Sequence, residues 1–167
     1  MKIKIDDVTH PCVIAFVEEH MRNLNLLSPP ESNHYLDLDA LRKPDVTFWS
    51  VWDGEEVVGC GAIKELDSKS GEVKSMRTSS SHLRKGIGAM ILQSIIQAGK
   101  ERGYQELYLE TGSMEAFFPA QKLYKSFGFD YCEPFADYEE DPNCVFMMKK
   151  IIKFRNNREV LLSDLAN

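Results

Sequence analysis

The sequence of 167 residues lacks any apolar run long enough to cross a membrane, and its start, "MKIKIDDVTHP", lacks the apolar core of a signal peptide. It also lacks an excess of basic residues, because 26 acidic side chains outnumber 20 basic ones and give a net charge of −6. Nucleic acids are bound by basic surfaces, so this balance argues against nucleic acid as the main partner. We expect a cytoplasmic protein that binds neither nucleic acid nor membrane.

Patterns typical of metal sites are also missing. Cys12, Cys60, Cys132 and Cys144 form no CxxC pair, and no histidine stands at metal-ligand spacing. Four reduced thiols in an intracellular protein, with no bound metal, are therefore expected. No repeat or low-complexity segment appears, and the hydrophobic share of 43% and charged share of 28% are those of an ordinary globular domain. The length suits a single domain with its own core.

Strand-like and helix-like segments alternate along the chain. Period-2 and period-3.6 patterns predict strands at 2–8, 46–52, 55–66, 72–78, 105–111, 129–135 and 144–151, and helices at 9–27, 36–43, 87–102 and 116–127. Strand 105–111 is reached from strand 72–78 across a helix, so these two should be parallel. The pattern predicts an α/β (α+β) fold with a mixed, mostly antiparallel sheet and one parallel step.

The segment "HLRKGIGAMIL", residues 82–92, places two basic residues and two glycines just before a helix. Free N–H groups and the helix dipole at such a start favour an anion, and glycine lets the backbone approach it closely. G-x-G alone is not specific: Ile91 replaces the third glycine of the dinucleotide fingerprint, and no P-loop is present. The alternative is a glycine-softened helix entry with a solvated Arg84–Lys85 pair.

The order of strand, basic glycine turn, helix and parallel strand resembles the GNAT superfamily of N-acetyltransferases. The pyrophosphate loop of that family reads [QR]-x-x-G-x-[GA] and matches "LRKGIG" at 83–88, while "A-x-x-L-Y-x-x-x-G-F" at 120–129 matches its acyl-CoA-flanking helix and next strand. "GEVKSMRT", "LETGSMEAF" and "PFADYEEDPNCVFM" resemble the YsnE-like bacterial branch. The resemblance implies a twisted sheet with one splayed parallel pair, flanked by helices, in one domain at 1–152. Residues 153–167 would be a C-terminal tail with a short helix.

The resemblance also implies acetyl-CoA as cosubstrate, without a metal. Its pyrophosphate would lie on the backbone N–H groups of Arg84, Lys85, Gly86, Ile87, Gly88 and Ala89. Its pantetheine arm would pair like an added strand with Met76, Arg77 and Thr78, where an N–H group could also stabilise the oxyanion. One departure is Leu83 in place of the usual Arg or Gln, which should weaken phosphate binding and leave Leu83 as a packing residue.

The same resemblance makes Tyr124 the acid that protonates the departing CoA thiolate. For the base that deprotonates the attacking amine, Glu72 is one candidate, because some GNAT members carry a glutamate at this remove and strand alternation would place Glu72 and Thr78 on one face. Glu110 on the next strand and a water chain are the alternatives.

The acceptor is expected to be a small-molecule amine or amino acid. Acidic residues in the connector 136–143, among them Asp137, Glu139 and Glu140, could attract a cationic amine, although a solvated acidic loop is an equal alternative. His20 and His34 come from the segment that walls the acceptor site in relatives. Two functions stay open, an N-acetyltransferase and an acyl-CoA sensor or degenerate module without turnover. The apolar tail could dock on its own domain or on a second subunit, so a homodimer is also open.

Overall fold

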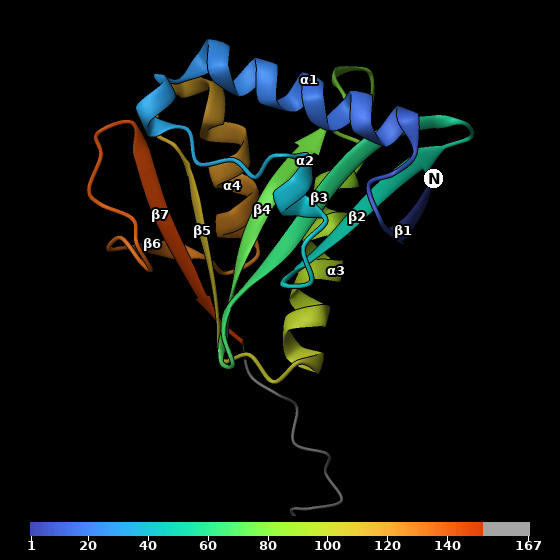
Figure 1. Ribbon diagram of the computed structural model, residues 1–167. Coiled ribbons are helices and arrows are strands. Elements are labelled where there is room, and N and C mark those ends of the chain that lie inside the picture. The colour runs from blue at the N-terminus through green and yellow to red at the C-terminus, as the bar shows by residue number, and fades with distance from the viewer. Residues whose placement is uncertain (152–167) are drawn as a thin grey trace, which may run out of the picture.

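The structure is a computed structural model that describes residues 1–151, and these residues form one sheet of seven strands with helices on both faces (Figure 1). The strand order is β1-β2-β3-β4-β5-β7-β6. The strands are β1 (Lys2–Asp6), β2 (Val46–Asp53), β3 (Glu56–Asp67), β4 (Ser70–Thr78), β5 (Glu106–Gly112), β6 (Asp130–Cys132) and β7 (Cys144–Lys150). All neighbours are antiparallel except β4 and β5. The predicted fold class, a mixed sheet with one parallel pair, is confirmed.

Four α-helices and three 3₁₀ turns connect the strands within residues 1–151. They are α1 (Pro11–Leu27), η1 (Pro30–Ser32), α2 (Leu38–Leu41), η2 (Ser80–His82), α3 (Ile87–Glu101), η3 (Glu115–Phe117) and α4 (Phe118–Ser126). Helix α1 begins as its sequence predicts, with Pro11 in the first turn and Nδ1 of His10 accepting the Cys12 N–H at 3.1 Å. None of the helices in this part of the chain is long and apolar enough to span a membrane.

Two apolar cores hold the helices on opposite faces of the sheet (Figure 1). On one face, Ile91 and Ile95 of α3 and Tyr124 of α4 pack in a cluster that includes Ile63 and Leu107. On the other face, α1 and α2 cover a second cluster. Its buried members include Val13, Phe16, Val17, Leu41, Phe48 and Ala62. Strand β3 therefore presents side chains to both layers, Ile63 to one and Ala62 to the other.

The parallel pair β4–β5 is short and then splays apart. Pairing covers only Ser70–Val73 against Glu106–Leu109, while β5 continues beside β7 as far as Gly112. Beyond Val73 the peptide groups of β4 that face β5 have no partner strand on that side. The predicted splayed pair is therefore present.

A β-bulge interrupts β4 in this splayed half. Ser75 has a φ of 57°, and the register against β3 shifts between Cys60 and Ala62. The extra residue reverses the alternation, so Arg77 points to α1, where its guanidinium donates to the Phe16 carbonyl, while Thr78 points toward the start of α3. The expectation that Glu72 and Thr78 share one face, which assumed uninterrupted alternation, is therefore wrong.

One predicted strand is shorter than expected, and the predicted tail is outside the part of the chain that the structure describes. The strand predicted at 129–135 is reduced to β6, because Pro134 cannot donate to a ladder and the chain leaves the sheet after Cys132. The predicted tail at 153–167 lies outside the described residues.

Candidate active site

The segment 83–88 carries the chain into α3 through two left-handed residues. Arg84 has a φ of 61° and Gly86, the N-cap residue, a φ of 79°. No side chain caps this helix, and the first helical bond is donated by Met90 to the Gly86 carbonyl, so the N–H groups of the first turn have no intrahelical partner. Arg84 and Lys85 are exposed beside them. The start of α3 therefore presents open N–H donors beside two exposed basic side chains, and its role as an anion site stays a prediction.

Leu83 and Gly88 show how this loop is packed. Leu83 is 59% exposed, so the expectation that it is a packing residue is wrong. At Gly88 a Cβ would lie 3.0 Å from Cδ2 of Leu123, so glycine is what lets the first turn of α3 approach α4 this closely.

A buried histidine ties the loop to the sheet, a feature that no sequence pattern had indicated. His82 Nε2 lies 2.9 Å from Oδ2 of Asp53, in the β2–β3 turn, and His82 Nδ1 lies 2.7 Å from the Ser81 hydroxyl. The hydrogen bond from His82 lowers the pKa of Asp53. This pair fixes the residue directly before the loop.

A cavity of about 130 Å³ opens where β4 and β5 splay apart. Met76 of β4, Glu110 of β5, Tyr124 of α4 and His20 of α1 line it. Tyr124 is 6% exposed, and within residues 1–151 its hydroxyl makes no hydrogen bond. Burial, with a smaller effect of Glu110, raises the pKa of Tyr124. The phenol is therefore a protonated and unengaged donor inside the cavity.

Two other titratable groups of the cavity are shifted toward their neutral forms. Burial raises the pKa of Glu110, an effect opposed by a hydrogen bond with Cys144 and by the positive charge of Lys74. Burial and the neighbouring Arg77 lower the pKa of His20 to about 4, so its imidazole is neutral at pH 7. Both groups could accept a proton in this cavity, and His20 lies on its wall, as expected for the segment that carries it.

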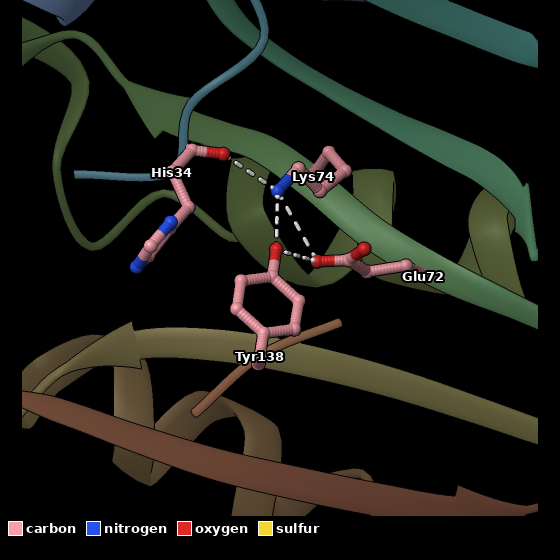
Figure 2. A network of polar contacts seen from close by, with 4 residues as sticks. All are labelled: His34, Glu72, Lys74 and Tyr138. Atoms are coloured by element: carbon pink, nitrogen blue, oxygen red, sulfur yellow. Dashed lines mark hydrogen bonds and ion pairs between the residues drawn. The ribbon is translucent and has the colours of Figure 1, made fainter. Parts of the chain in front are cut away.

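Glu72 belongs to a different environment, a buried polar network shown in Figure 2. Its Oε2 accepts hydrogen bonds from the Tyr138 hydroxyl at 2.6 Å and from the ammonium of Lys74 at 3.1 Å. The Lys74 ammonium also donates to the Tyr138 hydroxyl at 2.9 Å and to the His34 carbonyl at 2.8 Å. All three protons of this ammonium are therefore engaged. Glu72 does not line the narrow cavity, whereas Lys74 does.

Of the three β4 residues assigned to the pantetheine arm, the side chain of Met76 lines the cavity, while Arg77 turns away from it. The Arg77 guanidinium pairs with Glu19 at 3.2 Å and lies 4.6 Å from the ring centre of Phe16. Arg77 thus anchors α1 through its side chain, and only its backbone is left for the cofactor.

A wide groove of about 1030 Å³ adjoins the cavity and shares His34, Tyr35 and Lys74 with it. Carboxylates dominate its lining: Glu31, Asp45, Glu65, Asp67, Glu72, Glu106, Asp137, Glu139, Glu140 and Asp141, against the basic residues Lys64 and Lys74. The acidic connector, predicted to lie near the site, does border it. Such a groove attracts cations and repels anions.

Comparison with known proteins agrees with this architecture. Residues 14–129 match the family model described as the acetyltransferase (GNAT) family. The chain is 62% identical over 151 residues to a Bacillus subtilis (strain 168) protein named as an uncharacterized N-acetyltransferase, YsnE, covering 90% of this chain and all of the relative. It is also 39% identical over 140 residues to the IAA acetyltransferase of Azospirillum brasilense, covering 83% of this chain and 90% of that protein.

Solved structures share the fold. A Klebsiella pneumoniae protein assigned to the acyl-CoA N-acyltransferases superposes with a TM-score of 0.73 at 26% identity, over 90% of this chain and 97% of that one. An aminoglycoside 6'-N-acetyltransferase in complex with coenzyme A superposes with a TM-score of 0.69 at 17% identity, over 93% of this chain and all of the other. With the family model spanning most of the described residues, the chain belongs to the acetyltransferase (GNAT) family of acyltransferases, within its YsnE-like branch.

Proposed function

We propose that the protein transfers the acetyl group of acetyl-CoA directly to the primary amine of a small, cationic molecule or amino acid. The observation that carries this proposal is the cavity between the splayed strands, where the unengaged hydroxyl of Tyr124 and the carboxyl of Glu110 border the same small space. An acid and a base on one cavity are what acyl transfer from sulfur to nitrogen requires.

The cofactor would use backbone groups that the fold leaves without partners. The pyrophosphate would lie on the open N–H groups at the start of α3, beside Arg84 and Lys85. The pantetheine amides would pair with β4 beyond Val73, where β5 no longer does so. A backbone N–H between Met76 and Thr78 would then stabilise the negative charge on the thioester oxygen.

In the reaction, the nitrogen of the neutral amine attacks the thioester carbonyl, the C–S bond breaks, and the CoA thiolate leaves. Tyr124 would protonate this thiolate, and a base would take the proton released by the amine. Glu110 and Glu72 are both proposed for the base, with a water chain as the alternative. Position in the cavity and a raised pKa support Glu110, whereas the Glu72 carboxylate is engaged by Lys74 and Tyr138.

The acceptor would reach the cavity from the acidic groove, because the groove and the cavity share His34, Tyr35 and Lys74. Lys74 has no donor left for a substrate carboxylate, since its ammonium already makes three bonds. A positively charged amine is the acceptor that this lining favours.

A coupled assay of free CoA thiol, run with acetyl-CoA and a panel of amines and amino acids, tests the proposal. We expect thiol release that depends on the amine, and mass spectrometry should find a product heavier by one acetyl group. Calorimetry on the same preparation should show acetyl-CoA binding. Acetyl-CoA binding without turnover on any amine would instead make the protein an acyl-CoA-binding module, and absence of binding would remove the cofactor site altogether.

A further inference from the structure

Three metal-ligating side chains of different types meet at the border between the cavity and the acidic groove. They are His34, after η1, Asp141, in the connector before β7, and Cys144, the first residue of β7. One donor atom from each lies within 4.8 Å of the others. These residues are far apart in the sequence, so spacing could not have indicated them.

Neighbouring groups hold His34 and Asp141 in place. The His34 imidazole points away from the Lys74 network, into which only its carbonyl reaches (Figure 2). Its ring packs edge-on against Tyr138 at 5.1 Å between ring centres. Asp141 is fixed by two donors, the Ser32 hydroxyl at 2.6 Å and the Asn143 N–H at 2.8 Å. Donors of this kind orient metal ligands and are part of real metal sites.

The charges around the cluster also favour a cation. Cys144 lies beside the carboxylates of Glu110 and Asp141, and its thiol donates to the Ser32 carbonyl at 3.6 Å. Lys74 is the nearby cation, and its three protons are already engaged. A divalent ion would neutralise the carboxylates and take the thiol as thiolate, because coordination deprotonates a thiol outright.

We propose that His34, Asp141 and Cys144 form a site for a divalent transition metal of the zinc class. Nitrogen, sulfur and carboxylate oxygen is a mixture that Zn²⁺ accepts, whereas Mg²⁺ and Ca²⁺ take oxygen ligands. A water molecule would complete a tetrahedral set. Bound metal ties the segment after η1 to the connector and β7, and so fixes the wall of the acceptor entrance.

The inference does not rest on the proposed acetyl transfer, and its test uses binding alone. Untagged full-length protein is stripped with a chelator and titrated with Co²⁺, whose complexes with thiolate show a charge-transfer band in the near ultraviolet. We expect one equivalent of Co²⁺ to develop this band together with the visible bands of tetrahedral cobalt, and Zn²⁺ to displace both. The melting temperature should rise with Zn²⁺.

Variants identify the ligands. Cys144→Ser should abolish the charge-transfer band, and His34→Gln, at an exposed side chain, should weaken Co²⁺ binding at least about tenfold. Cys132→Ser, a thiol outside the cluster, and Cys12→Ser, an exposed thiol next to His10, are the matched controls and should keep the band.

Several outcomes overturn the proposal. They are the absence of a thiolate band with Co²⁺ in the wild type, a band that survives in Cys144→Ser, and a band that disappears in Cys12→Ser. Circular dichroism checks that Cys144→Ser folds. If it does not fold, unchanged Co²⁺ affinity in His34→Gln is sufficient to reject the site.

Discussion

Replacing Tyr124 by phenylalanine separates catalysis from stability, because the Tyr124 hydroxyl makes no hydrogen bond among residues 1–151. The ring stays in the core, edge-on to Phe129 at 6.0 Å between ring centres, and no buried partner is left unsatisfied. We therefore expect the variant to melt close to the wild type. Turnover should fall about tenfold to a hundredfold, the low end for a general acid, since a thiolate is a good leaving group.

Tyr138→Phe is the contrasting variant. The Tyr138 hydroxyl donates to the Glu72 carboxylate at 2.6 Å and accepts from the Lys74 ammonium at 2.9 Å, and Glu72 and Lys74 are both buried. A hydrogen bond to a charged group contributes about 1.5–3 kcal/mol to stability. For a chain of this size that corresponds to a melting temperature lower by about 3–12 °C. Removing the tyrosine hydroxyl should therefore reduce turnover in Tyr124→Phe and thermal stability in Tyr138→Phe.

Steady-state kcat and thermal melting, measured on the same preparations, check both expectations. The pH profile adds a second test. Because burial raises the pKa of Tyr124 above its ordinary value, the phenol stays protonated in alkaline solution, and kcat of the wild type should show no decline up to about pH 10. A Tyr124→Phe enzyme with wild-type turnover, or one that loses as much stability as Tyr138→Phe, would refute the reasoning.

Three further predictions address the cofactor, the acceptor and the base. Gly88→Asp places a carboxylate at the proposed pyrophosphate site and a Cβ 3.0 Å from the side chain of α4, so calorimetry should show weaker acetyl-CoA binding; unchanged affinity would exclude the loop as the phosphate site. Neutralising Asp137, Glu139 and Glu140 together should raise the KM for the amine without changing acetyl-CoA affinity, and an unchanged KM would make them only a solvated surface. The raised pKa of Glu110 means that folding favours its neutral form, so wild-type stability should fall as the pH rises above about 4.5 through the folded-state pKa. In Glu110→Gln this loss of stability with rising pH should be absent, and kcat should be lower than in the wild type. Melting temperature and kcat, each measured against pH, test this. If both pH profiles of the variant matched those of the wild type, Glu110 would not be the base.

Local rules were sufficient for most of the fold. Alternation and helical periodicity identified the strands and helices, and the crossover through α3 required a parallel β4–β5 pair. These local rules did not predict the bulge in β4, because Ser75 adopts a φ of 57° and neither glycine nor asparagine stands at this position to indicate it. Because the bulge adds one residue, the side chains after it point to the opposite face of the sheet. Contrary to expectation, Glu72 and Thr78 therefore do not share a face.

The glycine loop before α3 was predictable from local sequence, whereas the long-range side-chain contacts around it were not. A glycine loop at a helix start indicates an anion site from local sequence alone. The network of Glu72, Lys74 and Tyr138 joins residues 66 positions apart, and the His82–Asp53 pair joins residues 29 apart. No local pattern encodes such pairs, so the burial of Glu72 and the anchoring of the loop had to be read from the structure.

The bulge in β4 also bears on how this enzyme could acquire new acceptors. On one side of the bulge the strand sends Glu72 and Lys74 to the acidic groove, and beyond it Met76 and Thr78 turn to the face of α3. Neighbouring positions of one strand therefore contribute to two different surfaces, the acidic groove and the face toward α3. If the groove receives the acceptor as proposed, mutations at the groove positions alter acceptor preference and leave the side toward α3 intact, so selection can change the substrate without first rebuilding the proposed cofactor side.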